Sequence, residues 1–379
     1  MEQWKEYKLG EVAIPVRDRI DTSVLDASSY ISTENMLPDK AGVTLSSGVP
    51  SGKAIQFKEG DILISNIRPY FKKIWRADKV GGCSADIICL RASKEVEPLF
   101  FYYLLSQDMF FNYVMQGAKG TKMPRGDRNQ IMQWPVLLPS KSEQQKIASI
   151  LSALDEKIEV NRRINDNLGQ QAQALFKSWL SDCHEEVTIG QLSQNITDYT
   201  KCELPKVILI NSSDVTEGHF EHHNFSENRN LKGHFKKRFQ KGDILYSQVR
   251  PRNRHWGYCT FDADAYLAST QLMVIRNKAD VIPSILLYQY IIDDDVWMDF
   301  TNKTETRSGT FPQGNYEELS SIKVRYGADM SYISNKLKSI YTFIFNNEDE
   351  SRRLASLRDT LLPRLMSGEL KVNKIENVI

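Results

Sequence analysis

An internal repeat constrains the fold of this chain more than any other feature of its sequence. Phe, Gly-Asp-Ile-Leu, Ser and Arg-Pro hold the same places in Phe57–Pro69 and in Phe239–Pro251. Two more pairs of segments match in the same order along the chain: Tyr7–Gly10 with Val187–Gly190 and, more loosely, Gly120–Pro124 with Ser308–Pro312. Several matches in one order indicate a duplication, so we expect two similar globular domains.

Each copy of the repeat ends in a stretch that has the apolar spacing of a long helix. The intervals alternate between four and three residues, which is the heptad pattern of a coiled coil. One constant offset, that between Ile147 and Ile333, relates the two stretches. The predicted seam residues are Ile147, Leu151, Leu154, Ile158, Asn161, Leu168 and Leu175 in the first helix, and Ile333, Leu337, Ile340, Ile344, Asn347, Leu354 and Leu361 in the second.

A polar interruption lies near the middle of both seams, at Asn161 and Asn165 in the first and at Asn347 in the second. A polar residue on a hydrophobic seam lowers stability, but it also disfavours registers in which it would face leucine. Matching interruptions favour an antiparallel helix pair, because the polar positions then face each other. The other interpretation is that each helix packs only on its own domain and that its asparagines face water.

These patterns predict an α+β fold, with two α/β domains that are related by the repeat and separated by two long antiparallel coiled-coil helices. Ser142, ahead of Glu143, is expected to cap the first helix. The second helix is expected from about Ser331 to Met366 and to stop at Ser367-Gly368. The expected division is a first domain at 1–140, a first helix at 141–182, a second domain at 183–328, a second helix at 329–370 and a tail at 371–379.

Composition excludes some classes of protein and leaves others open. The 49 basic and 48 acidic side chains give a net charge of +1, which makes a polycationic coat protein improbable but does not decide DNA binding. Five cysteines without a CxxC pair fit free thiols better than disulfides or structural zinc. We find no signal peptide and no apolar run long enough to span a membrane, so a cytoplasmic protein is expected.

Taken together, the order of these features resembles the specificity subunits of Type I restriction–modification systems (the HsdS family). Their pattern of two target-recognition domains, each followed by a long helix, covers essentially the whole chain. The local matches are Lys58–Leu63, Lys241–Leu245, Glu143–Ala148 with Leu154–Ile158, and Leu361–Leu370. The second helix departs from the family pattern at its N-terminal boundary, where Tyr332–Leu337 stands in place of Gln-Gln-Lys-Ile.

The resemblance implies that each domain reads one half of a bipartite, asymmetric site in double-stranded DNA. It implies that the helix pair sets the gap and docks two modification (methyltransferase) subunits, which carry S-adenosylmethionine, and that restriction subunits translocate and cleave DNA. No cofactor and no catalytic residue is expected on this chain itself.

Two basic segments in each domain are candidates for DNA contact. One follows equivalent strands and has the aromatic neighbours Phe71 and Trp256; the other is a polar, glycine-containing loop, where scaffold ion pairs are not expected. Arg68 and Arg250, being shared, could equally be scaffold residues tied to a carboxylate. The candidates are Arg68, Tyr70, Lys72, Lys73, Lys119, Thr121, Lys122 and Arg125 in the first domain, and Arg250, Arg252, Arg254, Lys303, Thr306, Arg307, Ser308 and Thr310 in the second.

Motifs for chemistry are weak. Asn66–Tyr70 lacks the adjacent prolines of an adenine-methyltransferase loop, and Gly48–Ala54 is one residue short of a phosphate loop and ends in alanine where Ser or Thr is needed. No partner spacing makes a metal site of His219, His222 and His223.

Two other functions stay open at this stage. The chain could serve a solitary methyltransferase or a phage-exclusion system that has no restriction subunit. It could also be a coiled-coil adaptor that does not bind DNA.

Overall fold

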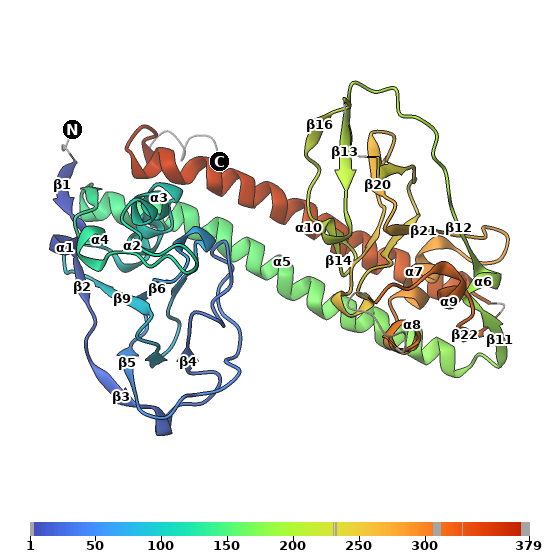
Figure 1. Ribbon diagram of the computed structural model, residues 1–379, viewed down its shortest axis with the longest axis horizontal. Coiled ribbons are helices and arrows are strands. Elements are labelled where there is room, and N and C mark those ends of the chain that lie inside the picture. The colour runs from blue at the N-terminus through green and yellow to red at the C-terminus, as the bar shows by residue number, and fades with distance from the viewer. Residues whose placement is uncertain (1–3, 230, 232, 306–311, 328, 373–379) are drawn as a thin grey trace. The chain divides into compact units, whose positions relative to one another are not determined.

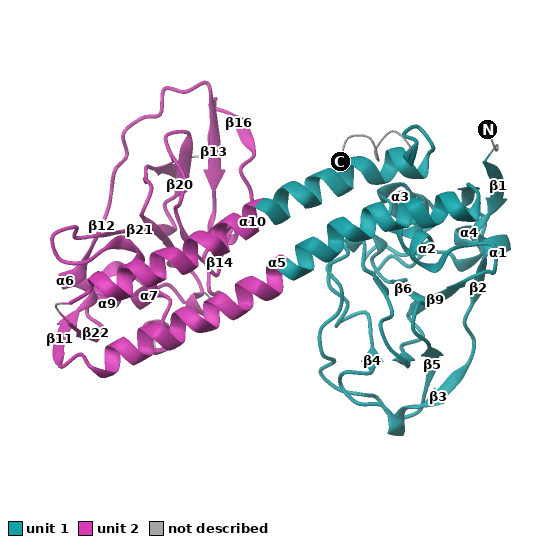
Figure 2. Cartoon of the chain, turned by 180° about the vertical axis from the view of Figure 1, so that it is seen from behind, with its two compact units in different colours: residues 1–160, 350–379 teal, residues 161–349 magenta. Residues whose placement is uncertain are grey.

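The computed structural model describes residues 4–229, 231, 233–305, 312–327 and 329–372, and they divide into two compact units. Unit 1 comprises residues 1–160 and 350–379, and unit 2 comprises residues 161–349 (Figure 2). Each unit mixes helices and strands, which confirms the predicted mixture of α and β structure. Each unit therefore combines one globular part with a portion of both long helices.

A four-stranded antiparallel sheet has the same strand order in both units. The order is β2-β9-β6-β7 in unit 1 and β12-β21-β18-β19 in unit 2. Figure 1 labels β2, β6 and β9 of the sheet in unit 1 and β12 and β21 of the sheet in unit 2. The bounds are β2 Ala13–Pro15, β9 Ile87–Ala92, β6 Ile62–Ser65 and β7 Ile74–Arg76, and β12 Ser193–Asn195, β21 Leu272–Asn277, β18 Ile244–Ser247 and β19 Trp256–Tyr258. The Ile-Leu of the repeated motif opens the buried strands β6 and β18, so the duplication places one framework in each unit.

The aspartate of the repeated motif holds this framework together. Asp61 accepts hydrogen bonds from Arg91 at 2.6 and 2.7 Å, and Asp243 accepts the matching pair from Arg276 at 2.7 Å each. Both carboxylate side chains are 1% exposed. Bidentate pairing satisfies a buried carboxylate, and it raises the pKa of each arginine through the hydrogen bond to its aspartate. The motif is therefore a structural element.

A second sheet differs between the units. Its order is β3-β5-β8-β4 in unit 1 and β16-β13-β20-β17 in unit 2. The bounds are β3 Arg19–Asp21, β5 Lys53–Phe57, β8 Gly81–Cys83 and β4 Tyr30–Ile31, and β16 Phe225–Glu227, β13 Lys206–Ile210, β20 Tyr266–Ser269 and β17 Phe235–Lys237. By chain order and pairing direction, β4, β5 and β8 correspond to β13, β17 and β20. The fourth strand is added on opposite edges, beside β5 in unit 1 and beside β13 in unit 2.

Short helices cover the first sheet and complete each core. The helices are α1 Leu9–Val12, α2 Pro98–Leu105, α3 Asp108–Gln116 and α4 Arg128–Ile131 in unit 1, and α6 Ile189–Leu192, α7 Ser284–Ile291, α8 Asp294–Glu305 and α9 Tyr316–Ser320 in unit 2. Strand pairs β1 Lys5–Lys8 with β10 Pro135–Leu138 and β11 Glu185–Thr188 with β22 Lys323–Tyr326 lead into the long helices, and β14 Val215–Thr216 and β15 His219–Phe220 form a hairpin in unit 2. Phe100 and Phe101 of α2 and Phe300 of α8 are fully buried in these cores.

The long helices are α5, Lys141–Ser181, and α10, Ser331–Met366. In unit 1, Ile147 and Leu151 of α5 share one core with Leu362 and Leu365 of α10, so the helix segments run antiparallel. The capping residue of α5 is Ser140, whose hydroxyl accepts a hydrogen bond from the Glu143 amide; the predicted cap at Ser142 is wrong, because that residue already lies inside the helix. Gly368, at φ 73°, follows the end of α10.

The asparagines of the two seams meet within unit 2. The Asn347 side chain donates to Asn165 Oδ1 at 2.8 Å, and the Asn165 side chain donates to the Ile344 carbonyl at 3.1 Å. The Asn161 side chain, 1% exposed, donates to the Asn347 carbonyl at 3.3 Å. Every predicted seam residue is buried or half-buried. Phe176 and Tyr341, which the heptad pattern had not included, are buried against Tyr290 and Tyr288 of α7.

Each globular part is tied to the long helix that follows it in the chain. In unit 1, the Tyr103 hydroxyl of α2 donates to Asp155 of α5 at 2.7 Å, and Asp155 also pairs with Arg358 of α10 at 2.7 Å. In unit 2, the Tyr341 hydroxyl of α10 donates to Gln289 of α7 at 2.6 Å. The two hydrogen bonds join equivalent positions of the repeat. The donor tyrosine lies on the globular part in unit 1 and on the long helix in unit 2.

Candidate nucleic-acid interface

A strained turn presents the repeated arginine at the end of β6 and of β18. Arg68 and Arg250 both have φ 49°, in the left-handed region that residues other than glycine rarely adopt. Lys72 and Arg254, four residues later, are also left-handed, at 49° and 53°. Strained backbone of this kind persists where the surrounding structure enforces it and is concentrated at functional sites.

The two segments predicted to contact DNA lie together in each unit. The Arg68 amide donates to the Pro124 carbonyl at 2.8 Å, and Lys119 and Arg125 exchange two backbone hydrogen bonds of 2.9 Å across the loop. In unit 2 the Arg250 amide donates to the Pro312 carbonyl at 3.1 Å. Each unit thus has a composite surface of turn and loop, which we call the turn–loop surface: residues 68–73 with 119–125, and 250–255 with the described part of 303–313.

Some of the predicted contact residues hold the turn itself. Lys72 pairs with Asp108 at 2.8 Å, and Arg254 pairs with Asp294, at the same place in the repeat, at 2.9 Å. The Arg254 guanidinium also lies 4.1 Å from the centroid of the Trp297 ring. Because they occur in both copies and use acidic partners at the starts of α3 and α8, these pairs are framework contacts, a role that the sequence analysis missed. The internal repeat could have indicated this role, because Asp108 and Asp294 occupy matching positions in the two copies.

Lys73 is also engaged by its own domain. Its ammonium donates to the Thr33 carbonyl at 2.8 Å and lies 5.8 Å from the centroid of the Phe71 ring. Burial lowers the pKa of Lys73, and the neighbouring Arg68 charge lowers it further. For DNA contact, this leaves Arg68 as the more available cation of the pair; it is exposed and has no carboxylate partner among the described residues.

The loop of unit 1 carries a mixture of paired and unpaired cations. Arg125 pairs with Asp86 at 3.1 Å and Lys119 pairs with Asp127 at 3.3 Å, both in exposed positions. The expectation that such a loop lacks ion pairs is therefore wrong for these two, because Asp86 comes from a segment distant in sequence and Asp127 directly follows the loop. Lys122 and Thr121 are exposed, and in the described part of the chain Lys122 has no carboxylate partner.

In unit 2 the first residue of the predicted loop lies on a helix. Lys303 lies in the last turn of helix α8 and pairs with Asp299 at 3.1 Å, so its assignment to a loop is wrong. Arg252 pairs with Glu305 at the end of the same helix. The remaining candidates, Thr306, Arg307, Ser308 and Thr310, lie outside the described residues.

The aromatic neighbours of the turns differ in their availability. Tyr70 is 47% exposed and Phe71 37% exposed, with ring centroids 4.6 Å apart. Trp256 is only 3% exposed and stacks on Tyr246 in the core, so its assignment to the interface is wrong. The matching position in the first copy is Ile74, which is fully buried in a strand. An isoleucine at that position could have indicated that Trp256 lies in the core.

Two negative observations apply to the described ranges. They contain no group of three or more His, Cys, Asp or Glu side chains placed to hold a metal ion. Among the same residues, no helix has both the length and the apolar character needed to cross a membrane. His219 and His222 instead pair with Glu348 and Asp214.

Comparison with known proteins shows which proteins this chain is similar to. Residues 1–170 match the family described as the Type I restriction modification DNA specificity domain. The specificity subunit of the HindI restriction enzyme from Haemophilus influenzae is 36% identical over 143 residues, which are 37% of this chain and 31% of that subunit. The MjaIX specificity subunit of Methanocaldococcus jannaschii is 22% identical over 313 residues, 73% of this chain and 70% of that one.

A solved structure has the same fold over nearly the full length. The Type I restriction–modification S subunit from M. genitalium aligns over 96% of both chains with a TM-score of 0.57 and 17% identity. The HindI match spans less than a third of that subunit, whereas this fold match spans both chains. Residues 1–170 are therefore similar to the Type I restriction modification DNA specificity domain, and nearly the whole chain has the fold of the M. genitalium S subunit.

Proposed function

We propose that this chain is the DNA-reading subunit of a Type I restriction–modification complex, in which unit 1 and unit 2 each recognise one half of a bipartite, asymmetric site. The observation that carries this proposal is the duplicated turn–loop surface. The same left-handed arginine follows the same strand of the same sheet in both units. Two copies of one reading surface with different side chains suit two different half-sequences.

Within each turn–loop surface, the proposed roles follow from side-chain chemistry. Arg68 has the forked guanidinium that recognises guanine in the major groove, while Lys122 suits phosphate oxygens. Tyr70 and Phe71 offer an exposed ring pair in unit 1, where unit 2 has Arg252 and Asn253. The two surfaces are therefore equipped to read different bases.

The long helices are proposed to set the gap between half-sites and to dock two modification subunits. Their outward faces carry large apolar side chains that a monomeric helix would not expose: Val160 at 47%, Ile164 at 43%, Leu357 at 47%, Phe343 at 63% and Tyr332 at 65%. Exposed apolar residues along helices are typical of protein interfaces. Modification subunits would supply S-adenosylmethionine and methyl transfer, and restriction subunits would supply cleavage, so the chain itself is proposed to be non-catalytic.

The proposal is tested by expressing the chain with its modification subunit and mapping methylated adenines in genomic DNA. We expect one motif with two specified halves and an unspecified gap. A continuous motif would contradict two separate reading units. No methylation, together with no salt-dependent gel shift by the complex, would favour an adaptor that does not bind DNA.

A further inference from the structure

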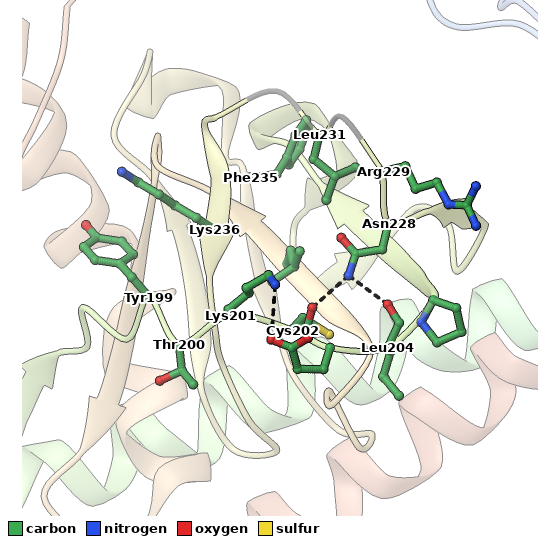
Figure 3. A pocket seen from close by; sticks show the side chains of 13 residues that line it. Tyr199, Thr200, Lys201, Cys202, Leu204, Asn228, Arg229, Leu231, Phe235 and Lys236 are labelled. Atoms are coloured by element: carbon green, nitrogen blue, oxygen red, sulfur yellow. Dashed lines mark hydrogen bonds and ion pairs between the residues drawn. The ribbon is translucent and has the colours of Figure 1, made fainter.

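Unit 2 contains a cavity of about 430 Å³ that no residue of the turn–loop surface lines. Figure 3 shows the side chains that line it. The cavity lies between the segment 199–205, the described residues after strand β16 and strand β17, with Leu267 of β20 at its base. None of the residues predicted to contact DNA lines it. We call it the β16 groove.

An apolar floor and a fixed wall give the β16 groove a defined shape. Cys202, Val207 and Leu267 form a small buried cluster, against which Leu231 and Phe235 pack. The Asn228 side chain donates hydrogen bonds to the carbonyls of Cys202 and Leu204, both at 2.8 Å. The backbone N–H of Asn228 donates a third, to the Pro205 carbonyl, at 2.9 Å. These three bonds join the wall to the end of β16, so the groove is preformed.

The rim of the groove is cationic. Lys201, Arg229 and Lys236 line it together with a single carboxylate, Glu203, which pairs with Lys201 at 3.3 Å. Arg229 and Lys236 are exposed and have no ion-pair partner in the part of the chain that the structure describes. The groove therefore presents two cations whose charge its own lining does not neutralise.

An exposed ring completes the rim. The Lys236 ammonium lies 4.9 Å from the centroid of the Tyr199 ring, and Tyr199 is 50% exposed. Cations beside an exposed aromatic ring, over an apolar floor, form the combination that holds a nucleic-acid strand: phosphates on the cations and a sugar or base against the ring. The volume also lies in the range of pockets that hold small ligands.

Unit 1 builds this region differently. The wall of the groove depends on β16, which is added beside β13, whereas the fourth strand of unit 1 lies at the other edge of the corresponding sheet. In the described residues of unit 1, β4, the counterpart of β13, is an edge strand. The groove thus belongs to what distinguishes the units, which is where recognition of two unlike half-sites must arise.

We propose that the β16 groove is a second DNA-contact site, which binds the sugar–phosphate backbone of one strand beside the half-site read by unit 2. Arg229 and Lys236 bind phosphates and Tyr199 packs against the adjacent nucleotide. This inference rests on the proposed function, because it assumes that unit 2 meets DNA.

The test measures equilibrium binding of the complex of the full chain with its modification subunit to a fluorescent duplex that carries the mapped site, over a range of salt concentrations. The double variant Arg229→Ala/Lys236→Ala should weaken binding by roughly tenfold or more and reduce the slope of log K against log salt by about 1 to 2. Tyr199→Ala should weaken binding about fivefold or more, and Tyr199→Phe should bind like the unchanged chain.

A matched control removes the same charge from another face of unit 2. Lys323→Ala/Arg325→Ala, on β22, should leave the salt slope unchanged. A groove variant that lost no more affinity and slope than this control would overturn the groove proposal while leaving the proposed function intact. Failure of the unchanged complex to bind the duplex would instead overturn the proposed function.

Two other readouts separate a DNA strand from a free nucleotide as the occupant. A duplex with 5-iodouracil beside the unit 2 half-site should cross-link to Tyr199 under ultraviolet light, and deoxyadenosine monophosphate should not compete at millimolar concentration. Saturable binding of the mononucleotide that Arg229→Ala/Lys236→Ala abolishes, without any cross-link, would show a free-nucleotide site and contradict the proposal.

Discussion

Replacing Asp61 by asparagine tests whether the repeated Gly-Asp-Ile-Leu motif stabilises the framework. The Asp61 carboxylate accepts two hydrogen bonds from Arg91 and a third, at 2.8 Å, from the Lys58 amide. Asparagine keeps the shape of the side chain but has one acceptor oxygen, so its amide group must face a donor. At least one charge-assisted bond is lost, and the ion pair disappears.

The magnitude follows from burial. Hydrogen bonds to charged groups contribute about 1.5–3 kcal/mol each, and breaking a fully buried ion pair costs about 3–5 kcal/mol. The Arg91 side chain is 35% exposed and can return to water, which keeps the cost below that upper range. We expect Asp61→Asn to lower the free energy of unfolding of unit 1 by about 2–4 kcal/mol.

Hydrogen exchange measured by mass spectrometry across a urea series resolves the two units in the intact chain. Asp61→Asn should lower the protection of β6 and β9, and Asp243→Asn should have the matching effect on β18 and β21. Asp166→Asn, in an exposed pair with Arg162, is the control and should cost less than about 0.5 kcal/mol. An effect of Asp61→Asn no larger than that control would refute a structural role for the motif.

Three further outcomes are expected. Lys122→Ala should weaken DNA binding by the complex and reduce its salt slope by about 1, without loss of thermal stability, because the lysine is exposed; an unchanged slope would remove it from the interface. Burial lowers the pKa of His219, but the hydrogen bond and charge of Glu348 and the charges of Glu221 and Glu217 outweigh this effect, so the pKa is raised. The contribution of the His219–Glu348 pair is therefore present below the ordinary histidine pKa and lost as the pH rises through the raised value. Protection of the β14–β15 hairpin should fall across that window, and His219→Gln should remove the dependence; because the imidazole is half exposed, the effect should stay below about 1 kcal/mol. The isolated chain should transfer no labelled methyl group from S-adenosylmethionine to DNA, and robust transfer by the pure protein would contradict a non-catalytic role.

Features set by local spacing could be predicted from the sequence. The heptad pattern placed the second helix from about Ser331 to Met366, and α10 has these bounds. The constant offset between copies also aligned the asparagines that hydrogen-bond in unit 2. Both predictions need only the periodicity of a helix and the assumption that two repeats fold alike.

Features set by distant partners could not be predicted in this way. The ion pair of Arg125 depends on Asp86, which lies far earlier in the sequence, and the residues around Lys303 did not indicate that this lysine lies on α8. The edge on which the fourth strand is added also follows no local pattern, because β3 and β16 are short strands in dissimilar sequence. The β16 groove exists because β16 is added beside β13, and no sequence motif predicted that pairing.

The central claim is that two units read two half-sequences and that the helix pair sets the gap between them. It is tested most directly by mapping methylated adenines in cells that carry the modification subunit and a chain from which one heptad is deleted in α5 and the facing heptad in α10, both on the same side of the asparagine positions. Seven residues shorten each helix by about 10 Å, or roughly three base pairs. We expect both half-sequences to be retained while the gap shrinks by about that number; an unchanged gap with retained methylation would contradict the account.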